Sequence, residues 1–564
     1  MCGNKIRCLL LSTLLLLSSC ATAQKNPIEF HTTSPELPRS DVYYQYLLAQ
    51  HYLRVNDIEK AVEAYQKAVN DDPYSPVLLT ELASLYVRQG KSAEALKLVE
   101  RAVRSDPKYQ MAYMLMGQLY AELGQNQKAI QSYKQVIKLD AANENVYLLL
   151  GTLYAQEGRF KEALEMFDHL QGLLPDNPVA LYYKGRVFLD MKFYDQAEAI
   201  YLEVLEIDPS FDNALLDLAY IYEVTDRLKD AQEAYQEILS FNPNSVQAHT
   251  RLGNLYMREG ELDEALDQFR ELIRGNRKDL ESRLKIGIIH YQQKKYDDAI
   301  EDFTTLLKEQ PQYDQALYYL ASTYEERGDT KQAIINLRLI PRNSPLWSTA
   351  QIRLALAFAK AKDYASGIDV LRSAIEKQPD LPDYYLYLAM VYEETEQYAE
   401  ALKTIDKGLE KSPRDGDLLF RKGIILDKMG RKNDAIDKMN EVLTIDPQNA
   451  AALNYIGYTY AELGINLPRA KQLIEQALKI EPEDGYILDS LAWVYFKMGQ
   501  PAKALEIMLQ AVEKVHQDPV IQEHLGDIYL ALGDKQKAEE AYRNAIKFDH
   551  NEPEKIQQKL KSIQ

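Results

Sequence analysis

The amino-acid sequence repeats with a period of 34 residues from Val42 to Glu552. Twelve successive units fit this period without an insertion, a one-residue insertion near Leu467 lengthens the thirteenth, and two further units follow. The eighth residue of all fifteen units is glycine or alanine, and the twentieth is alanine in every unit except one, which has Gly367. A period of this length is typical of stacked units, none of which can bury its apolar face alone. The sequence therefore predicts one all-α solenoid rather than three or four globular domains.

Each repeat is expected to form two short amphipathic helices that pack antiparallel. The recurring small residues mark the place where the two helix backbones approach most closely, because a larger side chain there would overpack the crossing by about 1–3 kcal/mol. Proline closes eleven of the repeats, which ends the second helix before the next repeat begins. Eleven of the 40 tyrosines occupy the eleventh position of a repeat, where they are expected to fill its core.

This pattern resembles the tetratricopeptide repeat (TPR) family. The resemblance implies a right-handed superhelix of about fifteen helix-turn-helix units over residues 42–552, with a capping helix over residues 553–564. It also implies that the second, fifth, ninth and twelfth positions of each repeat line an inner groove. Large apolar and aromatic residues at these positions include Tyr182, Tyr220, Tyr291, Tyr318, Leu356, Met390, Phe420, Tyr458, Trp493 and Phe496.

These groove residues are not needed for packing within a repeat, which favours a surface that binds a peptide or a helix of another protein. The alternative is that successive turns of the superhelix, or a second copy of the chain, bury them.

The segment before the repeats has the features of an export signal. Lys5 and Arg7 precede an apolar run of about ten residues, which is too short for a membrane span of roughly 20 residues and typical of a signal peptide. The run ends in two serines and Cys20, which resembles a bacterial lipobox. We expect a signal peptide over residues 1–19, with Cys20 as the lipidated residue, and a flexible tether rich in Pro, Ser and Thr over residues 20–41. The alternative is an ordinary signal peptide with an accidental cysteine.

The distribution of cysteines agrees with a lipid anchor. The other two cysteines, Cys2 and Cys8, lie within the predicted signal peptide, so the mature chain would have no free thiol and no internal disulfide. By resemblance to lipoproteins of diderm bacteria, the alanine after Cys20 implies the outer membrane, facing the periplasm. Two or three acyl chains would hold the protein there stably.

The charge and the motifs argue against several other functions. A net charge of −19 disfavours nucleic acid as a partner and disfavours adsorption to anionic lipid. Gly90, Lys91 and Ser92 resemble the end of a phosphate-binding loop, but the earlier glycine of that motif is replaced by Leu85. The eight histidines are scattered and have no metal-ligand spacing. We expect no enzymatic activity, no metal or cofactor and no small-molecule substrate.

The thirteenth and fourteenth repeats carry a more specific resemblance. The segments 453–458, 466–470 and 487–493 are similar to a region of Gram-negative TPR lipoproteins, among them adaptors that recruit a carboxyl-terminal processing protease to cell-wall hydrolases. The sequence thus predicts a non-catalytic scaffold that holds proteins together at the bacterial envelope, such as a protease and its substrates. The alternative is an assembly or export factor for pili, secretins or exopolysaccharide.

Overall fold

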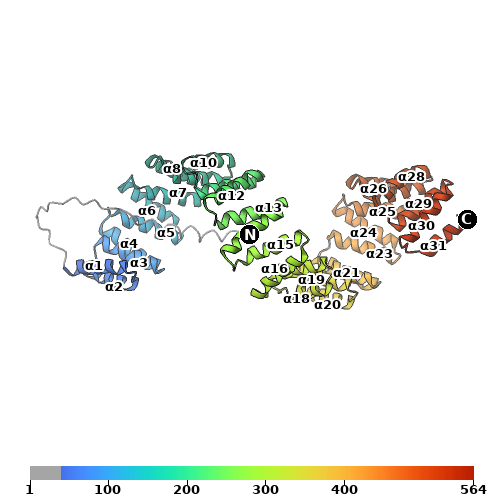
Figure 1. The fold of residues 1–564 in the computed structure, drawn as a ribbon, viewed down its shortest axis with the longest axis horizontal. Helices are drawn as coiled ribbons and strands as arrows, with labels where there is room; N and C mark the ends of the chain where they lie inside the picture. Colours follow the sequence, from blue (N-terminus) through green and yellow to red (C-terminus); the bar gives the residue numbers. More distant parts are fainter. Residues whose placement is uncertain (1–39, 564) are drawn as a thin grey trace. The chain divides into compact units, whose positions relative to one another are not determined.

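The computed structural model describes residues 40–563, which form 31 helices and no β-strand (Figure 1). The predicted all-α repeat solenoid is confirmed. The predicted signal peptide, Cys20 and most of the predicted tether lie outside the described residues. The first helix begins at Ser40, so it includes the last two residues of the expected tether.

The helices fall into two compact units, one within residues 1–241 and one within residues 242–564. The first unit contains α1 (Ser40–Arg54), α2 (Ile58–Asp71), α3 (Pro76–Arg88), α4 (Ser92–Ser105), α5 (Gln110–Glu122), α6 (Asn126–Leu139), α7 (Glu144–Gln156), α8 (Phe160–Leu173), α9 (Pro178–Asp190), α10 (Tyr194–Ile207), α11 (Asp212–Val224) and α12 (Leu228–Phe241).

The second unit contains α13 (Val246–Glu259), α14 (Leu262–Gly275), α15 (Leu280–Gln292), α16 (Tyr296–Glu309), α17 (Asp314–Glu326), α18 (Thr330–Leu339), α19 (Trp347–Lys360), α20 (Tyr364–Lys377), α21 (Pro382–Glu394), α22 (Tyr398–Lys411), α23 (Gly416–Lys428), α24 (Lys432–Ile445), α25 (Ala450–Leu463), α26 (Leu467–Ile480), α27 (Gly485–Lys497), α28 (Pro501–Lys514), α29 (Pro519–Ala531), α30 (Lys535–Lys547) and α31 (Pro553–Ile563). No helix in the described part of the chain is both long and apolar enough to cross a bilayer.

The turn between the two helices of each repeat has the same backbone form throughout. The fifteenth residue of every repeat has a positive φ, and nine of these residues are glycine. The six others are Asn56, Lys192, Asp226, Lys294, Lys362 and Glu396. Residues with a Cβ adopt this left-handed conformation at a cost of about 1–2 kcal/mol, so the packing of the two helices must outweigh that cost at these six turns.

The small eighth residue lies where the two helices of a repeat cross. A Cβ added at Gly287 of α15 would lie 2.5 Å from Cε1 of Phe303 of α16, which is fully buried. In the next repeat the equivalent residues are Ala321 and Leu337, and both are fully buried in one hydrophobic cluster. The lack of a Cβ at Gly287 therefore makes room for the ring of Phe303, whereas Ala321 lies opposite the smaller side chain of Leu337.

Gly287→Ala is expected to destabilise the second unit by about 1–3 kcal/mol, because the added methyl group overlaps the ring of Phe303. The double variant Gly287→Ala, Phe303→Leu recreates the residue pair of the following repeat. We expect it to be about 1 kcal/mol more stable than the sum of the two single effects implies. Urea denaturation of the three variants measures this coupling.

The matched control is Gly172→Ala in α8, where an added Cβ has no neighbour within 4 Å. This variant should be neutral or slightly stabilised, because alanine favours a helix over glycine. Strictly additive effects of the changes at Gly287 and Phe303 would contradict the steric explanation.

Candidate functional site

A pocket of about 490 Å³ lies in the second unit, on the first helices of four successive repeats, α23, α25, α27 and α29. It is lined by Phe420, Ala451, Asn454, Tyr455, Tyr458, Glu481, Asp484, Tyr486, Ile487, Asp489, Ser490, Asp518, Val520 and Ile521. Because these helices occupy equivalent places in consecutive repeats, the pocket is part of the surface that the repeat pattern assigns to the inner groove.

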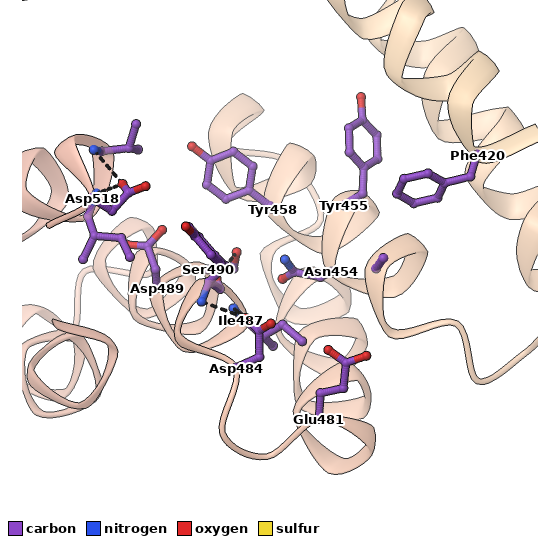
Figure 2. Close-up of a pocket in the computed structure, with 14 residues that line it drawn as sticks. Phe420, Asn454, Tyr455, Tyr458, Glu481, Asp484, Ile487, Asp489, Ser490 and Asp518 are labelled. Carbon is purple, nitrogen blue, oxygen red and sulfur yellow. Dashed lines mark hydrogen bonds between the residues drawn. The ribbon is translucent and has the colours of Figure 1, made fainter. Parts of the chain in front are cut away.

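One side of the pocket is aromatic. Figure 2 shows the rings of Phe420, Tyr455 and Tyr458 above the polar side chains of the pocket floor. These three side chains are half-buried, and that of Tyr486 at the start of α27 is 55% exposed. The rings thus offer apolar surface to a ligand without being closed off by the protein's own packing.

Two carboxylates of the pocket are fixed by helix capping. Asp484 accepts hydrogen bonds from the backbone N–H groups of Tyr486 (2.8 Å) and Ile487 (2.9 Å) at the start of α27. Asp518 plays the same part for α29, where it accepts from the N–H groups of Val520 (2.8 Å) and Ile521 (3.0 Å). The positively polarised helix ends stabilise both negative charges where they are.

A buried cluster supports the wall between α27 and α29. Nδ1 of His524 lies 2.8 Å from Oδ1 of Asp489, and the imidazole stacks on the indole of Trp493 with ring centroids 3.9 Å apart. The Trp493 Nε1–H donates to Glu462 of α25 (2.7 Å). Burial alone would lower the pKa of His524, but the charge of Asp489 and its hydrogen bond outweigh that effect, and the net pKa is raised. Asp489 therefore favours the protonated form of the imidazole.

The surroundings of Tyr458 are strongly negative. Burial raises the pKa of its hydroxyl, and the charges of Glu462, Asp489, Glu523 and Asp427 raise that pKa further, in this order. These carboxylates come from α25, α27, α29 and α23, so all four helices of the pocket contribute negative charge.

Two buried polar atoms of the pocket lining, Oδ1 of Asn454 and the hydroxyl oxygen of Tyr455, have no hydrogen-bond partner among the described residues. Oδ1 of Asn454 is shielded from solvent and receives no hydrogen bond from any described residue. An amide oxygen left unpaired in this way costs about 1–3 kcal/mol, which a donor on a ligand could recover.

The structure places the sequence-predicted groove residues in different environments. Phe420 and Tyr458 line the pocket, and Phe496 stacks on Trp493 with centroids 5.0 Å apart. Trp493 itself is only 6% exposed, so it belongs to the wall of the groove and not to its open surface. Tyr182 of the first unit is likewise buried, against Tyr183, Tyr201 and Phe211.

The remaining predicted residues lie away from the pocket. Tyr220 in the first unit and Leu356 in the second are exposed, at 41% and 37%. Met390 and Tyr291 are half-buried, and Tyr318 carries the guanidinium of Arg353 over its ring.

Sequence reasoning missed the polar half of the pocket. Asn454 and Asp489 occupy the fifth position of their repeats, which the repeat pattern assigns to the groove, but only apolar and aromatic residues at such positions indicate a binding surface by themselves. Asp484 and Asp518 each stand just before a first helix, and an N-cap signal could have identified them. Glu481 follows the end of α26 and carried no sequence signal. No group of His, Cys, Asp and Glu within residues 40–563 is arranged to hold a metal ion.

Comparisons with protein families agree on the repeat type. Models described as tetratricopeptide repeats match residues 80–144 and 182–245, residues 120–187 and 358–420, and residues 42–73 and 416–449. A tetratricopeptide repeat-like model matches residues 466–564. A model of the middle TPR-like domain of cilia and flagella-associated protein 70 matches residues 215–339.

A TPR repeat-containing protein of Pseudomonas aeruginosa is 33% identical over 90 residues, which are 16% of this chain and 15% of that protein. The match is thus confined to a small part of that relative. Among solved structures, a tetratricopeptide repeat protein from Parabacteroides merdae is 18% identical and covers 44% of this chain and 98% of its own, with a TM-score of 0.36. The APC/C hetero-tetramer Cut9–Hcn1 is 15% identical and covers 93% of this chain and 97% of its own, with a TM-score of 0.37.

Proposed function

Because this chain is a tetratricopeptide repeat protein, we propose that it is a non-catalytic scaffold that binds a segment of another protein in the pocket of α23, α25, α27 and α29. The observation that carries the proposal is the combination of half-buried aromatic rings with an unpaired buried acceptor. Phe420, Tyr455 and Tyr458 provide apolar contact area, and Oδ1 of Asn454 provides a place for a backbone or side-chain donor. Apolar surface with a few placed polar groups is the usual composition of a peptide-binding groove.

The binding surface can be tested with the double variant Phe420→Ala, Tyr486→Ala. Both side chains line the pocket and neither is buried, so their loss should reduce partner recovery at least about tenfold while helix content stays unchanged. The measurement is capture from a detergent extract, with the captured proteins identified by mass spectrometry.

The matched control is the double variant Leu509→Ala, Leu532→Ala. These residues are 48% and 40% exposed and do not line the pocket, so they should leave capture intact. Equal capture by the groove variant and the wild type would show that a different surface binds the partner.

We further propose that the scaffold is anchored to the outer membrane by lipid on Cys20 and faces the periplasm. The support is the lipobox-like sequence that ends at Cys20 and the lack of any other cysteine after the predicted signal peptide. The negative charge of the chain does not favour adsorption to anionic lipid, so the attachment would depend on the acyl chains.

Cys20→Ala is expected to move the protein from the membrane fraction to the soluble fraction, because the acylated residue is lost. Fractionation followed by immunoblotting measures the change. Cys2→Ala, which also removes one cysteine, should leave the protein on the membrane. A Cys20→Ala protein that remains in the membrane fraction would rule out the lipid anchor.

The more specific role that we propose is an adaptor that brings a periplasmic protease and its cell-wall hydrolase substrates together. The support is the resemblance of the thirteenth and fourteenth repeats to protease-adaptor lipoproteins, and these repeats supply most of the pocket. Binding two proteins on one scaffold would raise their effective concentration. Recovery of pilus, secretin or export components, and not of a protease, would favour the assembly-factor alternative.

A further inference from the structure

Every charged residue that lines the pocket is acidic. Glu481, Asp484, Asp489 and Asp518 contribute carboxylates, and the lining contains no lysine, arginine or histidine. Figure 2 shows Glu481 and Asp484 on the side of the pocket opposite the rings of Phe420 and Tyr455. An aromatic wall therefore faces an acidic wall.

The carboxylates are fixed in position and still have oxygen atoms that can accept hydrogen bonds from a ligand. The capping bonds of Asp484 and Asp518 use Oδ1 of each side chain, and no bond to the Oδ2 atoms forms within residues 40–563. Asp489 uses Oδ1 for its contact with His524. Asp484 and Asp518 each cap a helix, so a rotamer that turned either side chain away from the pocket would break the cap and destabilise that helix end.

The protein neutralises this charge only in part. His524 pairs with Asp489, and the more distant Glu523 is paired with Lys555, Lys559 and His550. No such ion pair is formed by Glu481, Asp484 or Asp518 among the described residues. The pocket is thus an unbalanced negative site, which repels an anionic segment and attracts a cationic one.

The chain itself shows how such a surface holds a cation. In the second unit the guanidinium of Arg353 lies 4.7 Å from the ring centroid of Tyr318, donates to Oγ of Ser322 (2.7 Å) and pairs with Glu325. Arg353 occupies the sixth position of its repeat. The sixth position of the fourteenth repeat is Ser490, which lines the pocket beside Tyr458 and Asp489.

The repeat positions of Tyr318, Ser322 and Glu325 are Asn454, Tyr458 and Ala461 in the thirteenth repeat, so the pocket is not a copy of the Arg353 site. It offers the same kinds of group, namely aromatic rings, hydroxyls and carboxylates, and has no arginine of its own. Ring faces attract cations to within about 6 Å of their centroids, and carboxylates form strong charge-assisted hydrogen bonds with guanidinium groups. The apolar stem of a long cationic side chain can lie on Val520, which also lines the pocket and is partly exposed.

We propose that the pocket recognises an arginine or lysine side chain, flanked by apolar residues, on a segment of the partner protein. This inference rests on the proposed function of the pocket as a protein-binding site and specifies the chemistry of the partner. The cationic head lies between the acidic wall and the rings of Tyr455 and Tyr458. The flanking apolar residues cover Phe420 and Tyr486.

The test uses a phage-displayed library of random 12-residue peptides, selected on the chain that begins at residue 21. Enriched peptides are synthesised with a fluorescent label, and their dissociation constants are measured by anisotropy. We expect the enriched peptides to share an arginine or lysine next to apolar residues. Their affinity should fall as the salt concentration rises, because the recognition is partly electrostatic.

The groove variant for this test is Glu481→Gln, Asp484→Asn, Asp518→Asn. Asparagine caps a helix about as well as aspartate, so the fold is preserved while three negative charges are removed. The dissociation constant should rise about tenfold or more. The control Glu506→Gln, Glu513→Gln, Glu540→Gln changes the net charge by the same amount at exposed residues of α28 and α30 and should have less than about a twofold effect.

The outcomes separate the two proposals. The cationic recognition would be overturned by enriched peptides that contain no arginine or lysine and bind the triple groove variant normally. If those peptides still lose affinity in the variant Phe420→Ala, Tyr486→Ala, the pocket remains the binding site. If the library yields no peptide whose binding depends on Phe420 and Tyr486, the proposed function fails and the cationic recognition fails with it. An equal loss of affinity in the groove variant and in its charge-matched control would also overturn the inference, because it would indicate a general effect of net charge.

Discussion

Glu523→Gln is expected to lower the free energy of unfolding of the last repeat and the capping helix by about 3 kcal/mol at pH 7. Glu523 in α29 is 7% exposed and contacts His550 (2.8 Å), Lys559 (2.7 Å) and Lys555 (3.2 Å). Lys559 lies in α31 and also pairs with Asp527 of α29 (2.6 Å). The carboxylate thus joins the capping helix to the first helix of the last repeat, and a neutral amide would leave Lys559 and Lys555 without their charged partner at a buried position.

The carboxylate of Glu523 also makes the stability of the capping helix depend on pH, and acid is expected to lower that stability. Burial acts to raise the pKa of Glu523, but the hydrogen bonds and charges of Lys559 and Lys555 outweigh it and lower the pKa from 4.5 to about 2. A folded-state pKa below the unfolded value means that the stabilisation is present above pH 4.5 and is lost as the pH falls through about 2. The Glu523→Gln variant should lack this component of the pH dependence.

Hydrogen exchange of the amides in α29, α30 and α31 is the suitable measurement, because repeat arrays open locally. Glu540→Gln in α30 is the control, since Glu540 is exposed and its change should leave the exchange rates unaltered. Unchanged protection of α31 in the Glu523 variant would contradict the role of this ion cluster.

Trp493→Ala is expected to destabilise the C-terminal repeats by about 3–5 kcal/mol, which is the usual cost of truncating a large buried aromatic side chain. The indole is 6% exposed, stacks on His524 and donates to Glu462. Its removal leaves a cavity between α27 and α29 and deletes the hydrogen bond to Glu462 of α25. Urea denaturation combined with hydrogen exchange of these three helices measures the loss.

Trp493→Phe is the matched variant, because phenylalanine keeps most of the buried ring and loses only the hydrogen bond to Glu462. Its cost should be about 1 kcal/mol. A Trp493→Ala protein of nearly normal stability that no longer captures its partner would contradict the structure, because it would make Trp493 a contact residue and not part of the wall.

The repeat architecture could be predicted from the sequence because its physical cause is local and recurs. Gly151 and Gly287, for example, are small because Phe167 and Phe303 cross the backbone at those points. The turn at the fifteenth position was visible only where it is glycine, since Lys192 carries no signal of a left-handed backbone. The period of the hydrophobic residues and the recurring small residues thus predict where the helices lie. The left-handed turns without glycine are imposed by the packing of the two helices on either side.

The candidate site could be predicted only in outline. The repeat position gives the direction in which a side chain points, but its burial depends on the neighbouring repeat. Trp493 and Tyr220 both occupy the ninth position, yet Trp493 is covered by His524 from the next repeat, whereas Tyr220 is 41% exposed. The acidic wall was missed because Asp484 and Asp518 serve as helix caps, and their second role depends on the way the repeats stack.

Photo-crosslinking tests the central claim most directly, because it reports contact and not merely affinity. A benzophenone amino acid replaces Phe420 in the pocket or Leu509 on α28 in otherwise unchanged protein, in cells that make the natural partner. The binding site described above predicts a partner crosslink from position 420 and none from position 509. Crosslinking from position 509, with none from position 420, would contradict it.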